Sequence, residues 1–424
     1  MPSAEPHYQI APHKKKQRPV EKYHQPSAPK MPNSKASNNR FQRVSRKRPC
    51  RICHKSNWCG YSTDEGTSIC MRVRTGSRRT SANGGNIHVH TDIARTSVIP
   101  RSPRPALSIP LAPLEIRDAV FRELIRISPA SHYYAELVRG PGGLLSRGLV
   151  ARQVSKYGAL PPTQKERADL AGVLRSFVHT NFIKYATLHS RSGVIGIPGF
   201  WQESSGMVHI WKPRSYHMPI LVIPYEDADG FIQACQIRLH SEDIPQDGKR
   251  YRWLASPQER YGTSSGTPIH FTFRPEHFPA GGTVLFTEGR LKAEVFVRFK
   301  PKAHVIATTG VSCSHSEMVI AGRPYNVLIG FDSDHRTNPA VCRQLARLIA
   351  HRCRDSLQHQ LTTTTRIVIW EGRRGPASTP KGIDEAVQNN IRLTAISISR
   401  WYATLRDKPR EEVTAYWSEI GFKC

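Results

Sequence analysis

The sequence predicts an α/β protein in which a C-terminal domain with a parallel sheet follows an α+β lobe, a small cysteine-rich module and a basic tail. Three observations lead to this prediction. After residue 283, apolar segments rich in β-branched residues alternate with helical segments, as in parallel strands joined by right-handed crossovers. Four cysteines cluster between residues 50 and 70 at spacings typical of metal ligands. The residues before this cluster contain almost no aliphatic side chains.

The charge of the chain indicates a polyanionic partner. Among its 424 residues, Lys and Arg total 62 whereas Asp and Glu total 33, so the formal net charge is +29. Nucleic acid accounts for this imbalance better than an acidic membrane surface or a need for solubility. No apolar run approaches the ~20 residues of a membrane span, and no apolar segment follows the N-terminal charges as it would in a secretory signal. The cysteines suit a reducing compartment, so we expect a cytoplasmic protein that does not contact membranes.

The N-terminal segment is expected to lack a core. Residues 1–48 are rich in Pro, Ser, Asn, Gln, Lys and Arg, which predicts a disordered basic tail. Its end, RFQRVSRKR, is either a solubilising stretch or a non-specific phosphate-binding arm. Residues 91–112 are rich in proline and are expected to form a linker.

Residues 49–90 predict a zinc-binding module. Cys50 and Cys53 form a CxxC knuckle, and Cys59 and Cys70 supply two further thiolates, enough for a tetrahedral Zn²⁺ shell. Because the segment has little core, the metal would supply much of its folding energy. The spacing leaves two alternatives open. A histidine could replace one cysteine, or the cysteines could simply be reduced and unrelated; the candidate histidines are His54, His88 and His90.

Residues 113–280 predict a lobe that is helical first and then α+β. Helical periodicity marks LEIRDAVFRELIRI, LLSRGLVARQVSKYG and RADLAGVLRSFV, and short strands follow in VHIW, MPILVIPYE, GFIQACQIRL and YRWLAS. The helical part fits a scaffold better than a helix-turn-helix. In KRYRWL, arginine and aromatic side chains could hold a single strand, although Tyr251 and Trp253 also fit alternate positions of a β-strand.

Residues 281–395 carry the alternating pattern, and residues 396–424 predict a helical tail. The expected strands are VLFT, AHVIAT, NVLIGF and RIVIW, separated by helices at about 290–299, 314–320 and 338–357.

Carboxylates follow two of these strands. Glu288 ends the first, and Asp332 and Asp334 follow the third. The carboxyl ends of parallel strands meet at one edge of a sheet, so we expect these side chains to converge on a divalent cation, Mg²⁺ or Mn²⁺. Lys292 and Lys381 could neutralise phosphate there, and Asp384 lies after the last strand at the same edge. A lone DxD is more often a solvated turn, but here two acidic motifs follow strands of one α/β unit.

In order and spacing, TEGRLKA, ATTGVSCSH, GFDSDH and KGIDEA resemble the motifs of the TOPRIM domain, a Rossmann-like parallel-sheet domain shared by bacterial primases, topoisomerases and nucleases. The cysteine segment and the middle of the chain resemble a family of primase-like TOPRIM proteins of bacterial genomes and mobile genetic elements, over roughly residues 50–390. The resemblance implies that Glu288 is a general acid/base or metal ligand and that Asp332 and Asp334 bind Mg²⁺.

By the same resemblance, the lobe before the TOPRIM sheet binds the template. The residues implied in nucleic-acid binding are Arg238, Lys249, Arg250 and Arg252. The chain departs from replicative primases at Lys292, where those enzymes have an acidic residue. This departure leaves the number of bound metal ions and the chemistry open.

The function expected from these features is that of a primase-like nucleotidyltransferase in DNA replication, with single-stranded DNA and nucleoside triphosphates as its partners. A TOPRIM nuclease and a non-catalytic DNA-binding accessory protein are the alternatives. A topoisomerase would need a nucleophilic tyrosine on a large additional domain, for which the chain has no room. No GxxxxGK[ST] loop occurs, so a helicase would have to be a separate protein.

Overall fold

The computed structural model describes residues 41–62, 66–80, 85–90, 109–188, 193–246, 248–372, 375 and 378–422. The chain divides into two compact units, Met1–Arg104 and Pro105–Cys424. The predicted tail (1–48) and linker (91–112) lie mostly outside the described residues. Within the described part, no helix is long and apolar enough to cross a membrane.

The first unit contains a small antiparallel sheet with the strand order β1-β2-β3-β5-β4. Its strands are β1 (Phe41–Arg43), β2 (Gly60–Ser62), β3 (Thr67–Cys70), β4 (Arg79–Thr80) and β5 (Asn86–Val89). The prediction that the tail continues to residue 48 is wrong at its end, because Phe41–Arg43 pair with β2 and the Val44 side chain is buried against the cysteines. The cysteine module therefore begins at Phe41, before its first cysteine.

The lobe of the second unit is built on an antiparallel sheet with the order β11-β10-β9-β6. Its helices are α1 (Leu114–Ile127), η1 (Ala130–Tyr133), η2 (Tyr134–Arg139), α2 (Ala151–Val154), α3 (Gln164–Asn181), α4 (Ile183–Leu188) and η3 (Ser241–Asp243). Its strands are β6 (Gly158–Leu160), β7 (Phe200–Gln202), β8 (Val208–Ile210), β9 (Ile220–Glu226), β10 (Ile232–Arg238) and β11 (Tyr251–Trp253).

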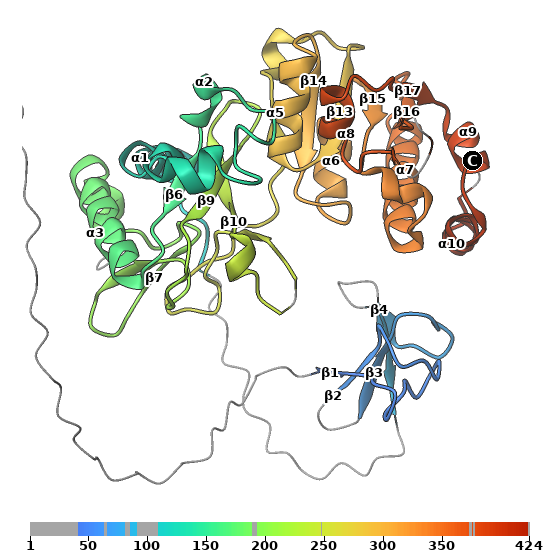
Figure 1. Ribbon diagram of the computed structural model, residues 1–424, viewed down its shortest axis with the longest axis horizontal. Coiled ribbons are helices and arrows are strands. Elements are labelled where there is room, and N and C mark those ends of the chain that lie inside the picture. The colour runs from blue at the N-terminus through green and yellow to red at the C-terminus, as the bar shows by residue number, and fades with distance from the viewer. Residues whose placement is uncertain are drawn as a thin grey trace, which may run out of the picture. The chain divides into compact units, whose positions relative to one another are not determined.

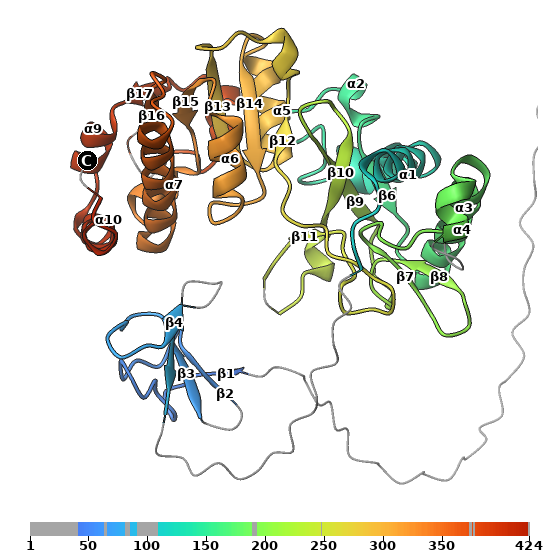
Figure 2. The ribbon, with the colours of Figure 1, turned by 180° about the vertical axis from the view of Figure 1, so that it is seen from behind.

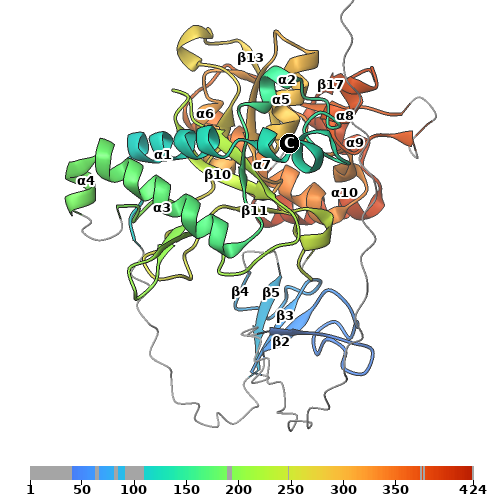
Figure 3. The ribbon, with the colours of Figure 1, turned by 60° about the vertical axis from the view of Figure 1, so that its left-hand side comes forward.

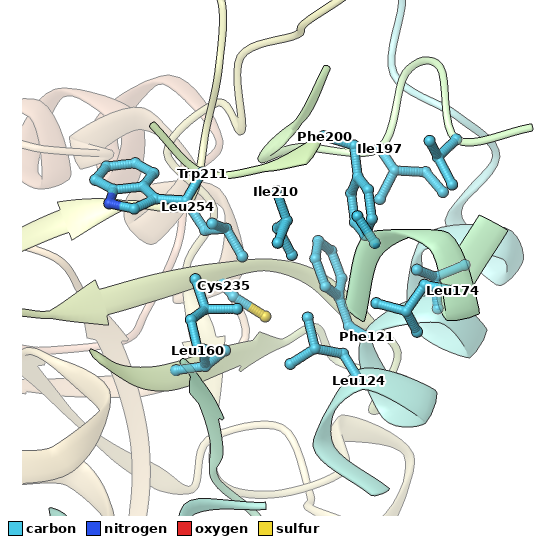
Figure 4. Packing of buried hydrophobic residues seen from close by; sticks show 14 of the residues in the cluster. Phe121, Leu124, Leu160, Leu174, Ile197, Phe200, Ile210, Trp211, Cys235 and Leu254 are labelled. Atoms are coloured by element: carbon cyan, nitrogen blue, oxygen red, sulfur yellow. The ribbon is translucent and has the colours of Figure 1, made fainter. Parts of the chain in front are cut away.

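Helix α1 forms because its apolar residues recur on one face and pack against β10. Helix α3 begins with a capping box, in which Oγ1 of Thr163 accepts from the N–H of Glu166 at 3.2 Å and the Thr163 N–H donates to the Glu166 carboxylate. Figure 3 shows α1 and α3 side by side. Helix α1 packs against β10, and α3 packs against β8. Figure 4 shows their buried side chains, with Phe121, Leu124 and Leu174, packed against strand residues such as Leu160 and Cys235. The helices therefore serve as a scaffold, as preferred from the sequence.

One predicted helix of the lobe is largely wrong. Of LLSRGLVARQVSKYG, only Ala151–Val154 is α-helical, and the residues before it form turns. Gly148 has a φ of 95°, a left-handed conformation that interrupts a helix, and a Cβ there would lie 2.5 Å from Oε1 of Gln388. The close approach of α8 to this loop decided the local structure. Helical periodicity in the sequence gives no information about such a contact.

The C-terminal domain has a six-stranded sheet with the order β12-β14-β13-β15-β16-β17. Its strands are β12 (His270–Phe271), β13 (Thr283–Glu288), β14 (His304–Thr308), β15 (Asn326–Ile329), β16 (Thr365–Ile369) and β17 (Thr394–Ile396). Its helices are η4 (Pro275–His277), α5 (Arg290–Phe299), α6 (His315–Ala321), η5 (Ser333–Arg336), α7 (Pro339–Gln358), α8 (Ile383–Gln388), α9 (Ile398–Ala403) and α10 (Asp407–Glu419).

The four predicted strands are confirmed and run parallel. A wholly parallel sheet, however, is wrong, because the edge strands β12 and β17 pair antiparallel. Both edge strands are only two or three residues long, too short for a period-two pattern to show in the sequence.

Helices cover both faces of this sheet. Figure 1 shows α8 in front of the sheet, and Figure 2, from behind, shows α6 and α7 in front of it. Helices α5 and α8 pack on the first face, and α6, α7, α9 and α10 pack on the second. The C-terminal helices thereby belong to the core, since Trp401, Val413 and Trp417 are buried among residues of α7 and the sheet.

A buried ion network joins the lobe to the C-terminal domain. Arg290, the first residue of α5, is 0% exposed. Its guanidinium donates to the Pro224 carbonyl in β9 and lies 3.2 Å from the Glu226 carboxylate and 3.4 Å from that of Glu294. The Tyr225 hydroxyl accepts from the Arg290 N–H at 3.3 Å. The start of α5 is therefore tied to β9.

We expect Arg290→Met to destabilise the Pro105–Cys424 unit strongly. The substitution leaves the Glu226 and Glu294 carboxylates without their guanidinium, and breaking a buried ion pair in this way costs about 3–5 kcal/mol. Denaturant unfolding would measure the loss, with exposed Arg366→Met as the matched control. Equal unfolding midpoints for the two variants would contradict this role of Arg290.

Candidate active site and cysteine cluster

Two strand-end acidic motifs meet at one edge of the six-stranded sheet. Glu288 ends β13, and Asp332 follows β15, the strand that pairs in parallel with β13. The Asp332 N–H donates to Oε1 of Glu288 at 3.3 Å. Between β13 and α5, Gly289 has a φ of 78°, which lets the chain leave the strand and enter the helix within one residue. The topology thus brings Glu288 and Asp332 together, as the strand pattern predicted.

Lys292 lies against these carboxylates. It occupies the first turn of α5, and its ammonium group donates a hydrogen bond to Oδ1 of Asp332. Burial by itself would lower the pKa of Lys292, but the negative charges of Asp332 and Glu288 outweigh burial and raise the pKa above its ordinary value. Lys292 therefore holds a positive charge at the edge of the sheet.

Lys381 holds the second aspartate. Its Nζ lies 3.0 Å from Oδ2 of Asp334 and 3.8 Å from Oδ2 of Asp332. The hydrogen bond to Asp334, more than any other influence, raises the pKa of Lys381. The loop that carries Lys381 is fixed locally, because the Ser333 N–H donates to the Lys381 carbonyl at 2.9 Å and the Trp370 indole donates to the Pro380 carbonyl at 2.9 Å.

Asp384 reaches the same edge from α8. Its side chain is 5% exposed, and Oδ2 lies 3.9 Å from Nη2 of Arg147, a residue of the lobe. Burial raises the pKa of Asp384, although Lys292 and Arg147 oppose the shift. The adjacent Gly382 leaves room for the carboxylate, since a Cβ there would lie 2.2 Å from Oδ1 of Asp384. The six residues proposed for catalysis from the sequence, Glu288, Lys292, Asp332, Asp334, Lys381 and Asp384, are thus linked by contacts or direct electrostatic influence.

Glu288 has the environment of a proton acceptor. Burial raises the pKa of its carboxyl, Asp332 adds to the rise, and Lys292 opposes it. A carboxylate whose pKa is raised binds a proton more strongly than an ordinary glutamate, as a general base requires.

The donor set fits a hard divalent cation. Oδ1 of Asp334 and Oδ1 of Asp384 are buried and have no hydrogen-bond partner in the described part of the chain, and Mg²⁺ or Mn²⁺ prefers carboxylate oxygens. The carboxylates are not drawn into one ligand shell, because the cysteine cluster is the only described group of three or more His, Cys, Asp or Glu ligand atoms lying within 4.8 Å of one another. Lys292 and Lys381 instead pair with the aspartates at this edge.

The lobe presents arginines beside this edge. Arg238 ends β10, is 8% exposed, and has a lowered pKa because of burial and because Arg147 and Arg250 lie nearby. The Nε atoms of Arg147 and Arg238 are buried without a hydrogen-bond partner among the described residues. Like charges held close together in this way favour an anion, and Arg147 connects the group to Asp384.

The other predicted nucleic-acid contacts lie at the start of β11. Lys249 is exposed, whereas Arg250 and Arg252 are half-buried, and Arg252 is the register partner of Ile237 in β10. The aromatic residues between them are structural, because Tyr251 and Trp253 pack against the lobe core and the Trp253 ring centroid lies 4.9 Å from that of Tyr225. Arg147 was missed in the sequence, where it is one arginine in a glycine-rich stretch with no motif around it.

The four cysteines converge as predicted. The sulfur atoms of Cys50, Cys53, Cys59 and Cys70 all lie within 4.8 Å of one another, which fits a tetrahedral Zn²⁺ shell. Backbone N–H groups support the sulfurs, with Val73 donating to Cys70 at 3.2 Å and Met71 to Cys59 at 3.4 Å.

The alternative with a histidine ligand is not supported by this geometry. Nε2 of His88 is 2.8 Å from the Val73 carbonyl, and Nε2 of His90 is 2.8 Å from Oγ of Ser68. His54 is exposed and belongs to no ligand group among the described residues.

Trp58 is a feature of the cysteine module that the sequence interpretation missed. It precedes Cys59, has a φ of 67° and is 71% exposed. Residues 41–90 include ten Lys or Arg and two acidic residues. An exposed aromatic ring on a cationic module is suited to stacking with an unpaired base. The sequence signal that could have identified Trp58 is its position directly before a predicted zinc ligand, Cys59.

We expect zinc removal to unfold the cysteine module without unfolding the second unit. The metal would hold a segment whose buried core is mostly the cysteines themselves. Metal analysis and amide hydrogen exchange on Cys59→Ser and on chelator-treated protein would measure this, with Cys313→Ser as control. A zinc-free chain whose module exchanges as slowly as before would refute it.

We expect Glu288→Gln to be more stable than the wild type at neutral pH. The folded-state pKa of Glu288 is raised, so its contribution to stability is present below the ordinary pKa near 4.5 and is lost as pH rises through the folded-state value. Thermal unfolding from pH 4 to pH 8 should show a flatter profile for Glu288→Gln. Exposed Glu317→Gln should follow the wild type, and an unchanged slope in Glu288→Gln would count against a buried, raised carboxyl.

Comparisons with known proteins add the following. No protein-family model matches the chain, and no curated protein matches it. Among solved structures, it is similar to the zinc-binding and RNA polymerase domains of the Aquifex aeolicus primase, with 14% identity over 73% of this chain and 68% of that chain and a TM-score of 0.42.

Two further structures are similar. The DnaG primase catalytic domain bound to ssDNA has 13% identity over 72% of this chain and 84% of its own, with a TM-score of 0.41. The RNA polymerase domain of Mycobacterium tuberculosis primase DnaG has 13% identity over 73% of this chain and 98% of its own, with a TM-score of 0.41. The similarity to these primase structures concerns the fold. The chemistry of the chain is judged from its own residues.

Proposed function

We propose that the chain is a primase-like nucleotidyltransferase that builds primers on single-stranded DNA. The observation that carries this proposal is the placement of Asp384 between two sets of charges: Lys292 of the carboxylate edge, which influences its titration, and Arg147 of the lobe, whose guanidinium lies 3.9 Å away. At this edge, carboxylates pair with lysines and lie next to the arginines of the lobe. Such an arrangement can hold a phosphate in place while it reacts.

The proposed reaction joins two nucleotides. The 3′-hydroxyl of one attacks the α-phosphorus of a nucleoside triphosphate, a new P–O bond forms, and the bond to the β-phosphate oxygen breaks to release pyrophosphate. Glu288 takes the hydroxyl proton, for which its raised pKa is suited. Lys292, Lys381 and the lobe arginines hold negative charge on the phosphates. When bound by Asp332 and Asp334, Mg²⁺ or Mn²⁺ would supply further charge stabilisation.

The cysteine module would contact the template. Its cationic surface attracts the phosphate backbone, and the exposed Trp58 ring offers a stacking surface. All four zinc positions would be filled by cysteines, so this metal would support structure rather than catalysis. Unwinding of duplex DNA would fall to a separate helicase.

Template-directed synthesis tests this function. With single-stranded DNA, ribonucleoside triphosphates and Mg²⁺ or Mn²⁺, we expect short labelled products. We expect Asp332→Asn to reduce their formation at least about a hundredfold, because it removes a carboxylate that would hold the divalent cation at the reacting phosphate. The same substitution at exposed Asp407 is the control and should leave synthesis unchanged.

Other outcomes of this assay would replace the proposal. Degradation of the template without nucleotides, lost in Asp332→Asn, would indicate a metal-dependent nuclease that uses the same carboxylates. DNA binding that survives Asp332→Asn and Glu288→Ala, with no product under either metal, would indicate a non-catalytic accessory protein.

A further inference from the structure

A cavity lies away from the carboxylate edge, where the lobe meets the C-terminal domain. Its volume is about 1200 Å³, and α1, α2, the β9–β10 turn, β12 and the end of α5 line it. Figures 1 and 3 show α2 beside α5, and the Gln153 amide of α2 lies 3.5 Å from the Glu294 carboxylate of α5.

The cavity and the carboxylate edge lie on opposite faces of α5. Lys292, in the first turn, contacts Asp332, whereas Arg298, in the last turn, lines the cavity. With 3.6 residues per turn, Glu294, Val297 and Arg298 lie on the face of α5 opposite Lys292. The cavity is thus a feature separate from the carboxylate edge.

Cations dominate the ionisable lining. Six basic residues face three acidic ones, which are Glu226, Asp227 and Glu294. The basic residues are Arg122, Arg126, Arg152, Lys156, Arg274 and Arg298.

Several of these cations are engaged in the folded chain. Arg122 and Arg126 pair with acidic residues of their own helix, Lys156 lies 3.6 Å from Glu294, and Arg298 donates to the Gly148 carbonyl. Arg152 and Arg274 differ, because their guanidinium groups make no hydrogen bond or ion pair with any described residue. Guanidinium groups present a planar fork that matches phosphate oxygens.

The cavity also has an apolar wall. Phe271, Phe273 and Val297 are half-buried and line it, and the two phenylalanine ring centroids are 5.8 Å apart. Ligand sites typically combine apolar surface with a few placed polar groups in about 300–1,000 Å³. Free arginines beside aromatic rings match a ligand that has both phosphates and a base.

We propose that this cavity is a binding site for a nucleoside polyphosphate, with Arg152 and Arg274 on the phosphates and the Phe271–Phe273 wall against the base. Because residues of both the lobe and the C-terminal domain line the cavity, the bound ligand stabilises the docking of the two. The floor of the cavity includes Glu226 and Glu294, the partners of Arg290, so the ligand lies next to the network that fixes α5.

The test uses the full chain in EDTA, so that no divalent cation can hold a phosphate at the carboxylate edge. Calorimetric titration with ATP should detect a site, and Arg152→Ala with Arg274→Ala should weaken its affinity about tenfold or more. The control pair, Arg366→Ala with Arg400→Ala, removes the same charge from exposed positions elsewhere on the C-terminal domain and should retain the affinity. Thermal unfolding without ligand should be alike in both pairs, because all four side chains are exposed.

Further probes separate the parts of the proposal. Tripolyphosphate and adenosine should each bind more weakly than ATP, since each lacks half of the contacts. Equal binding of ATP and tripolyphosphate would overturn the assignment to a nucleotide, and equal losses in the two arginine pairs would overturn the assignment to this cavity. Weakened binding of a single-stranded oligonucleotide, with ATP binding unchanged, would replace the nucleotide site with a nucleic-acid track.

Discussion

The buried guanidinium of Arg290 is the interaction on which the arrangement of this protein depends. It stands two residues after Glu288, is 0% exposed, and joins α5 to the carbonyl of Pro224 and the carboxylate of Glu226 in the lobe. A buried charge is tolerated only where opposite charges and hydrogen bonds surround it, so the network specifies one relative position of lobe and sheet. Arg290, which joins the lobe to the sheet, is therefore a near neighbour of Glu288 in the chain.

Each face of helix α5 makes a different contact. Leu291 and Val295 pack into the lobe core, Ala293 and Phe296 pack onto the sheet, and Lys292 contacts Asp332. One ten-residue helix thus carries the inter-lobe contact, the sheet contact and a charged group of the candidate active site. A shift of α5 would change all three together.

Electrostatic balance distinguishes this edge from a simple acidic metal site. Lys292 and Lys381 each neutralise an aspartate, while the lobe brings arginines whose charges are not balanced in the same way. An incoming phosphate would meet positive charge on the lobe side, and a cation would meet carboxylate oxygens on the sheet side. Lys292 is thus a structural part of the site, with an ion-paired partner in Asp332.

The sequence by itself determined the strands β13 to β16, the helices between them, the convergence of Glu288 with Asp332, and the cysteine cluster. These features follow from hydrophobic periodicity within each segment, from ligand spacing, and from the general rule that successive parallel strands end at one edge of a sheet. Only the tertiary structure decided that Gly148 breaks a predicted helix against Gln388, that short antiparallel strands close the sheet, and that Arg147 reaches Asp384. The same holds for Arg290 and for the cavity at the end of α5. In each case the deciding contact joins residues far apart in the chain, and no pattern within one segment encodes the identity of a distant partner.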